Sequence, residues 1–173
     1  FGDPFEREAE RVWKDVVENR AVSREAAREI YGVVVTDDEQ LDAEATAKLR
    51  AERRAASVAK AGRKARKLAG PDLARVTENL AVRRHGDALH TCCAKCGTDL
   101  GPISANYKEH AVQEDNDIRH SNPNVGDYKR YIDERPVFRQ FFCPGCGSLL
   151  ENEIAREGDP LLRDIEITKI RVK

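Results

Sequence analysis

Two pairs of cysteines have the spacing of metal-binding turns. Cys93 and Cys96 lie three positions apart, Cys143 and Cys146 repeat the spacing, and a glycine directly follows each pair. Thiolates at this spacing can turn both sulfurs toward one metal ion, and the glycine lets the backbone fold beneath them and donate N–H groups to the sulfurs. Two such turns supply four soft ligands, the closed tetrahedral set of structural zinc. The sequence therefore predicts a structural Zn²⁺ site formed by Cys93, Cys96, Cys143 and Cys146.

The ligand set and the metal both leave alternatives open. A rubredoxin-type iron centre uses the same turn geometry, and four thiols can also remain reduced or form disulfides without metal. Cys92 could replace Cys93 in a C-x3-C pair, although C-x2-C matches the second pair better. His90 and His110 could serve as ligands, but with four cysteines available we expect them at the surface or hydrogen-bonded. Five cysteines, four of them in C-x2-C pairs, favour metal thiolates over disulfides, so we expect a cytoplasmic protein.

No other group of residues has a pattern typical of catalysis. Glu114, Asp115 and Asp117 could bind a hard metal ion, but we interpret them as solvated side chains of a polar loop. The sequence has no phosphate-binding glycine-rich loop and no Ser/His/Asp constellation. We therefore assign no catalytic and no cofactor-binding residues to this chain, and whether it is itself an enzyme stays open.

The elements that must position the cysteines are strands. The two pairs are separated by 46 residues, against about 15 to 20 in a minimal zinc ribbon. We expect strands over residues 103–112, 137–142, 149–155 and 164–172, a polar loop over 116–127 and a short helix or turn over 128–133. These elements predict a zinc-ribbon-like antiparallel β domain over residues 87–173.

The residues before this domain have helical patterns. Asp3 and Pro4 predict a helix start, with apolar residues at helical spacing to about residue 19, and a second helix is expected between Ser23 and Gly32, followed by a strand over 33–35. An Ala/Lys/Arg-rich stretch predicts a long basic helix from Asp42 to about residue 68, and residues 72–82 a further short helical turn. The fold class is therefore α+β, with a helical tail (1–40), a helical linker (41–86) and the β domain (87–173).

Charge is segregated along the 173 residues although the net charge is only −1. Residues 48–84 carry 12 basic and 3 acidic side chains, whereas residues 1–40 carry 6 and 11. The basic stretch is either a solvated linker or a clamp for an acidic partner surface. No aromatic residue lies among these charges, which argues against nucleic acid as the partner. The side chains in question are those of Arg50, Arg53, Arg54, Lys60, Arg63, Lys64, Arg66 and Lys67. No run approaches the 18 apolar residues of a membrane span, and the chain contains no Met and begins at Phe1, so we expect it to lack its natural start.

The N-terminal residues resemble the C-terminal end of the hydantoinase B/oxoprolinase family of large ATP-dependent subunits. The resemblance covers about residues 1–36 and rests on three short stretches. They are Gly2-Asp3-Pro4, Glu10-Arg11-Val12 and the spaced residues from Val22 to Val34. The resemblance implies that these residues form a docking or closing segment of a larger subunit, because the reaction centre of that family lies upstream of this tail.

Residues 89–168 resemble the small zinc-containing gamma subunit of the acetone carboxylase family and its acetophenone carboxylase relatives. The resemblance rests on the two cysteine pairs, Asn106-Tyr107-Lys108, the stretch Arg139–Gly147, residues 149–153 and Asp164-Ile165. It implies a complex that uses ATP to join bicarbonate and a ketone into a β-keto acid.

The two resemblances together suggest a structural subunit that bridges large hydantoinase A-like and hydantoinase B-like subunits. ATP and a divalent metal are expected in those partners only. Two alternatives remain, a subunit of an ATP-dependent hydantoinase or oxoprolinase complex and a nucleic-acid-binding zinc ribbon. The sequence does not identify the substrate or the stoichiometry.

Overall fold

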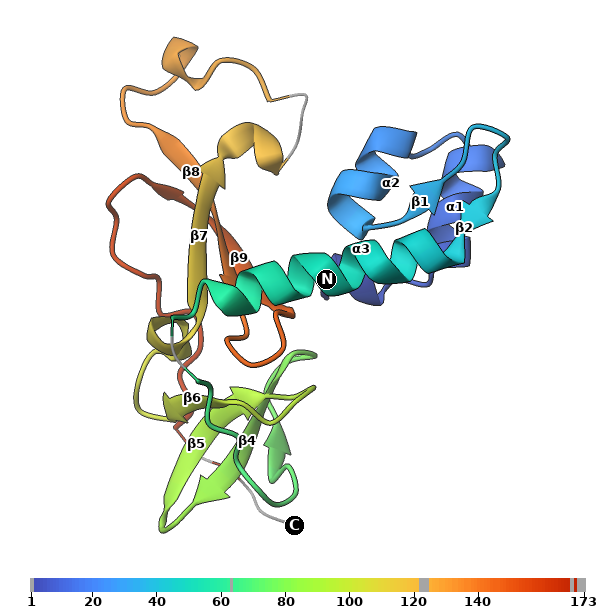
Figure 1. Ribbon diagram of the computed structural model, residues 1–173. Coiled ribbons are helices and arrows are strands. Elements are labelled where there is room, and N and C mark those ends of the chain that lie inside the picture. Colours follow the sequence, from blue (N-terminus) through green and yellow to red (C-terminus); the bar gives the residue numbers. More distant parts are fainter. Residues whose placement is uncertain (1, 63, 122–124, 169, 171–173) are drawn as a thin grey trace.

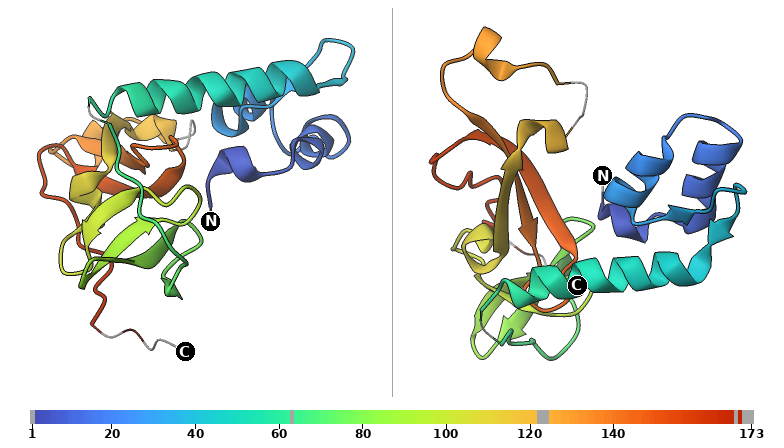
Figure 2. Two further views of the ribbon diagram at one scale, coloured as in Figure 1. Left: turned by 60° about the horizontal axis from the view of Figure 1, so that its bottom comes forward. Right: turned by 45° about the horizontal axis from the view of Figure 1, so that its top comes forward.

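The protein has an α+β arrangement in which helices precede two antiparallel sheets (Figure 1). The computed structural model describes residues 2–62, 64–121, 125–168 and 170. A small N-terminal module holds two helices and a two-stranded ribbon, and one helix runs from this module to the two sheets (Figures 1 and 2). The α+β class expected from the sequence is confirmed.

The N-terminal module packs two helices and the ribbon around a small apolar core. The elements are α1 (Ala9–Val17), α2 (Arg24–Tyr31) and the antiparallel strands β1 (Val34–Val35) and β2 (Leu41–Asp42). The buried side chains at its centre are those of Val12, Val16, Ala27 and Val33. Because β2 leads directly into the next helix, this core fixes where that helix starts.

The expected ends of α2 are confirmed, but the first helix differs from its prediction. Ser23 caps α2, and Gly32 ends it with φ at 60°, the left-handed conformation that favours glycine. The helix expected over residues 4–19 is divided into a 3-10 turn at Pro4–Glu6 and α1. The chain between them is extended, so the Asp3 cap serves the short turn only.

Helix α3 (Ala43–Ala59) is shorter than the basic helix expected to reach residue 68. The side chain of Asp42 caps its first turn. Beyond the helix, Gly62 has φ at 61°, and the N–H of Leu68 donates to the carbonyl of Gly97 at 2.8 Å. Residues 66–68 therefore join the cysteine-bearing sheet, because an alanine-rich continuation of the helix would have little apolar surface to bury.

The first sheet has four antiparallel strands in sequence order. They are β3 (Ala74–Arg75), β4 (Leu80–His85), β5 (Ala88–Cys93) and β6 (Asp99–Pro102). The helical turn expected over residues 72–82 is wrong, because this stretch contains β3 and the start of β4. The boundary expected between residues 86 and 87 falls in the turn between β4 and β5, which pair over six positions.

The second sheet has three antiparallel strands, again in sequence order. They are β7 (Val112–Asp117), β8 (Pro136–Phe142) and β9 (Leu149–Arg156). The strands expected over residues 137–142 and 149–155 are confirmed as β8 and β9. The strand expected over 103–112 is wrong, because a 3-10 turn at Tyr107–His110, capped by the Asn106 side chain, occupies this stretch.

The remaining predictions concern the loop and the C-terminal segment. Residues 116–127 are not one loop, since β7 extends to Asp117 and a 3-10 turn follows at Ile118–His120, while residues 122–124 lie outside the described part. The short helix expected over 128–133 is confirmed as a 3-10 turn at Tyr128–Arg130. The strand expected over 164–172 is wrong for residues 164–168 and 170, which pair with no strand, and its other residues lie outside the described chain.

The principal core lies where the two sheets meet. Leu80, Leu100 and Leu150 from the two sheets, and Tyr107 from the 3-10 turn between them in the chain, have buried side chains that pack around the cysteines. Within the described residues, no helix is long and apolar enough to cross a bilayer. Each sheet contributes one cysteine pair to this core, so the metal-binding turns lie at the junction of the sheets.

Candidate metal centre

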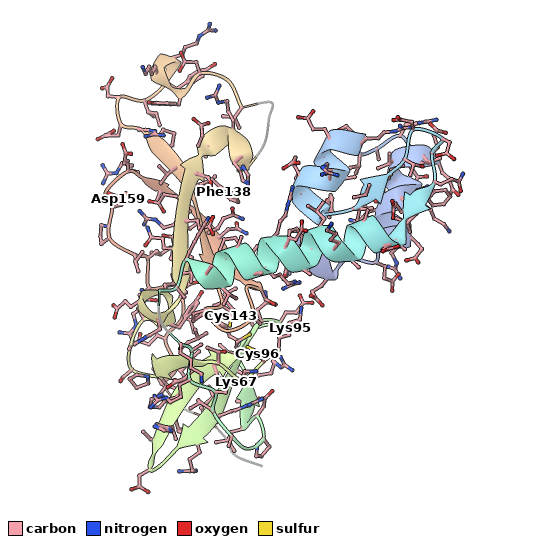
Figure 3. The ribbon with its side chains drawn as sticks, in the orientation of Figure 1. Lys67, Lys95, Cys96, Phe138, Cys143 and Asp159 are labelled. Carbon is pink, nitrogen blue, oxygen red and sulfur yellow. The ribbon has the colours of Figure 1, made fainter. Side chains whose placement is uncertain are left out.

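The four cysteines of the two C-x2-C pairs converge on one point. Their sulfur atoms all lie within 4.8 Å of one another. Cys93 Sγ is 3.8 Å from Cys146 Sγ, and Cys96 Sγ is 3.6 Å from Cys143 Sγ (Figure 3). Zinc–sulfur bonds of about 2.3 Å give a tetrahedron with edges of about 3.8 Å, whereas a disulfide would bring two sulfurs to about 2.05 Å. The separation therefore fits a shared metal ion.

The two turns have the same backbone geometry. In the first, Gly97 N–H donates to the carbonyl of Cys93 at 2.8 Å, and Gly147 does the same to Cys143 at 2.8 Å in the second. Both glycines have φ near 70°, at 72° and 68°. Residues that carry a side chain rarely adopt this left-handed backbone conformation, which explains why a glycine follows each pair.

Hydroxyl groups and hydrogen bonds between the thiols tune the sulfurs. Thr98 Oγ1 lies 3.0 Å from Cys96 Sγ, and Ser148 Oγ lies 3.4 Å from Cys146 Sγ. The hydrogen bond with Cys143 is the largest cause of a lowered pKa at both Cys96 and Cys146. The pKa of Cys146 is lowered to about 6. Hydrogen bonds within the same group raise the pKa of Cys93 and Cys143, so the protons of the metal-free thiols are shared unevenly among the four sulfurs.

The donor set fits a structural zinc ion. Four thiolates fill a tetrahedral zinc shell, so no position remains for water or substrate. Cys93 and Cys143 are buried and their partners are half-buried, which places the site inside the protein. The identity of the metal remains a prediction.

Cys92 and the two histidines lie outside the four-sulfur group. Cys92 packs beside Leu68 and Ala81, and burial raises the pKa of its thiol to about 11. His90 Nδ1 is 2.8 Å from Asp99 Oδ1, as expected for a hydrogen-bonded histidine. The sulfur of Cys93, and not that of Cys92, therefore completes the group.

Comparison with known proteins identifies the family. Residues 73–171 match the model of the acetone carboxylase gamma subunit. The chain belongs to this family. Over 81 residues it is 36% identical to the acetophenone carboxylase beta subunit of Aromatoleum aromaticum, which covers 45% of this chain and 63% of that protein. The chain thus matches less than two thirds of this relative, and the N-terminal module and α3 precede the gamma-subunit match.

Several residues that carry the gamma-subunit resemblance meet in a second buried cluster. The side chains of Lys108 and Arg139 are only 1% and 2% exposed, and both pair with Glu153, at 2.7 and 3.3 Å. Lys108 also lies 3.4 Å from Asp164, to which the hydroxyl of Tyr107 donates at 3.2 Å. Because each buried charge has an opposite partner, the cluster avoids the large penalty of an unpaired buried ion.

Further contacts anchor this cluster to the second sheet. Arg139 forms two hydrogen bonds to Asp115, at 2.9 and 3.2 Å, and the Lys108 ammonium lies 5.0 Å from the ring centre of Phe141. Burial raises the pKa of Asp115, but the Arg139 guanidinium outweighs it and the net shift is downward. This cluster was not predicted from the sequence, although the arginine in the apolar run of β8 indicates a buried ion pair.

The acidic side chains considered as hard-metal ligands do not converge. Glu114 pairs with Lys60 at 2.7 Å, Asp115 with Arg139, and Asp117 with Arg119 at 2.9 Å. Their interpretation as loop residues was wrong, because all three lie on β7. Strand alternation points Glu114 away from the face that Asp115 and Asp117 share, and each of these two is paired with its own arginine, so the three do not form a shared ion site.

The basic side chains considered either as a solvated linker or as a clamp for a partner are largely engaged within the chain. Arg50 donates to the carbonyls of Tyr31 and Arg7, and Arg53 pairs with Glu29 at 2.9 Å. Arg66 pairs with Asp99 beside the first cysteine turn. Lys64 and Lys67 are exposed, and Arg63 lies outside the described residues.

Arg54 connects the N-terminal module to the second cysteine turn. Its guanidinium donates to Ser148 Oγ at 2.6 Å and lies 2.8 Å from Asp3 and 2.6 Å from Glu6. Glu6 also forms an ion pair with Lys95, which lies between Cys93 and Cys96 in the first cysteine turn. The Ser148 oxygen thus accepts hydrogen bonds from the Arg54 guanidinium and from the Cys146 thiol. We call Arg54, Asp3, Glu6 and Ser148 the Arg54 clamp.

Proposed function

We propose that this chain is a structural zinc-binding subunit or domain of a multi-subunit ATP-dependent carboxylase. The reaction would resemble that of acetone or acetophenone carboxylases, in which a ketone and bicarbonate give a β-keto acid. The single observation that carries the proposal is the closed four-sulfur centre within a gamma-subunit match. The role of the chain would be to bridge or stabilise large hydantoinase A-like and hydantoinase B-like subunits.

The chemistry of the centre supports a structural role. Cys93, Cys96, Cys143 and Cys146 would hold the ion, which when bound supplies a cross-link between the two sheets. Because these four sulfurs complete the shell, substrate activation at the ion is not expected. Among the described residues, the acidic and basic groups around the centre form ion pairs and not a nucleophile–base pair. In this proposal, catalysis, ATP and a divalent metal belong to the partner subunits, as the gamma-subunit resemblance implies.

The nucleic-acid alternative has less support. The basic side chains of α3 and of the stretch after it pair with acids of the same chain, which leaves few cations to contact phosphates. The hydantoinase or oxoprolinase alternative rests on the N-terminal resemblance, and assays with the large subunits would separate it from a carboxylase.

Native mass spectrometry of the protein purified gently from its source tests the proposal. We expect one zinc per chain and association with subunits several times larger than 19.4 kDa. Chelation should release the large subunits, because the metal supplies folding energy to the sheets. A free 19.4 kDa species, or a chelated complex that stays assembled, would refute the bridging role.

A further inference from the structure

A groove of about 470 Å³ lies between the N-terminal module and the second sheet. One wall comes from the 3-10 turn and α2, the other from β8 and β9, and α3 closes one side (Figure 1). We call it the module–sheet groove. Its lining includes Ile30, Arg53, Lys60, Glu114, Phe138 and Asn152.

The sheet wall is an apolar face that the rest of the chain leaves partly open. Residues of β8 alternate, so that Val137 and Phe141 are buried on one side while Phe138 and Phe142 line the groove on the other. Phe138 is paired across the sheet with Ile154, which is 67% exposed. The opposite wall presents Ile30 at 41% exposure, so apolar surface faces the opening from both sides. Such a patch, bordered by polar residues, is typical of a protein–protein contact.

Glu114 gives the groove a charge preference. Its Oε2 binds Lys60, but its Oε1 is shielded from solvent and has no hydrogen-bond partner among the described residues. A buried acceptor without a partner is unfavourable, and a donor brought into the groove would remove that penalty. The cation on the opposite wall cannot supply it, because Arg53 is held by Glu29.

We propose that the module–sheet groove binds a segment of a large partner subunit that places an Arg or Lys side chain against Glu114 Oε1. Apolar side chains of the same segment would pack on Phe138 and Ile30, and the amides of Gln140 and Asn152 would hydrogen-bond its backbone. Charge complementarity favours this occupant, since the groove offers an unsatisfied carboxylate oxygen among apolar walls. The identity of the partner rests on the proposed function.

Site-specific photo-crosslinking in the native complex tests where the partner lies. p-Benzoylphenylalanine replaces Phe138 in the groove or, as a control, Tyr131, which is 81% exposed and outside the groove lining. We expect position 138 to form an adduct with a large subunit, at a peptide containing Arg or Lys, in higher yield than position 131. If the chain copurifies with large subunits and position 138 gives no adduct, or an adduct with a second copy of the chain, the groove proposal fails and the proposed function stands. If it does not copurify with them, both fail.

Charge and shape variants test the recognition chemistry. Glu114→Gln should weaken retention of the large subunits roughly tenfold, and Ile30→Arg should do so by steric and charge conflict. The matched controls are Glu109→Gln and Leu162→Arg, exposed positions outside the groove lining that should leave retention unchanged. Lys60→Gln removes the ion pair with Glu114 but leaves the unpaired Glu114 oxygen in place. A loss of retention as large as that of Glu114→Gln would overturn the assignment. Unaltered melting of each variant shows that the fold is intact.

Discussion

Removal of the Arg54 side chain should detach the N-terminal module from the metal centre. The side chain is 18% exposed and that of Asp3 only 4%, so this ion pair is shielded from water. Arg54 also donates to Ser148 and lies 5.6 Å from the ring centre of Phe5. Arg54→Ala therefore removes contacts to the module and to the second cysteine turn in a single change.

The expected loss is about 3 kcal/mol. Removing one partner of a buried pair costs about 3 to 5 kcal/mol, and we take the lower end because Glu6 is half exposed and Asp3 keeps its bond to the N–H of Phe5. At about 2 to 4 °C per kcal/mol for a chain of this size, the melting temperature should fall by about 6 to 12 °C. The matched control is Lys48→Ala on the same helix, whose side chain is 75% exposed and which should change stability by less than about 0.5 kcal/mol.

Two probes can separate the module from the sheets during urea unfolding. Trp13, the single tryptophan, lies in α1 and reports on the module, and a zinc-binding dye reports release of the ion. In the unaltered chain the two transitions should coincide. In Arg54→Ala the Trp13 transition should move to lower urea more than zinc release does. If both transitions of Arg54→Ala match those of Lys48→Ala, the clamp does not connect the two parts.

Three further changes probe the metal centre and the buried cluster. Cys96→Ser should reduce bound zinc well below one per chain and destabilise both sheets, whereas Cys92→Ser should leave zinc content unchanged in elemental analysis. Lys108→Ala should cost about 3 to 5 kcal/mol in chemical unfolding, because it leaves Glu153 and Asp164 with one cation fewer in a buried site. Burial, and then the Asp164 carboxylate, raises the pKa of Tyr107, so the stability from its neutral hydroxyl is present below pH 10.0 and is lost as the pH rises above it. Tyr107→Phe should flatten this alkaline loss, and an unchanged alkaline profile would contradict the assignment.

The features that the sequence predicts well depend on local interactions. Ser23 and Gly32 define the ends of α2 within a few residues of chain, and each cysteine turn closes through its own glycine. Strands β8 and β9 alternate clearly because one of their faces is buried and the other is open. The convergence of the two cysteine turns, separated by 46 residues, could be predicted because a structural zinc ion requires four ligands and each turn supplies two.

The features that it misses depend on contacts distant in the chain. Three consecutive residues are buried at the start of β4 and three at the end of β5, so neither strand has an alternating pattern to detect. Residues 164–168 do alternate, because Ile165 and Ile167 are half-buried and their neighbours exposed. That alternation reflects packing of an extended segment against the core, without a partner strand. The buried cluster was missed because Lys108 and Glu153 are 45 residues apart.

The segregated charge of the sequence has an internal explanation. Three cations of the middle segment pair with an acid from another part of the chain, Arg54 with Asp3 in the module, Lys60 with Glu114 on β7 and Arg66 with Asp99 on β6. Exposed pairs contribute at most about 1 kcal/mol, so Lys60 and Arg66 add little stability. Their effect is to fix orientation, which places α3 between the module and the sheets and forms the module–sheet groove. The basic segment therefore acts as a connector within the chain, and the groove proposed to bind a partner lies beside it.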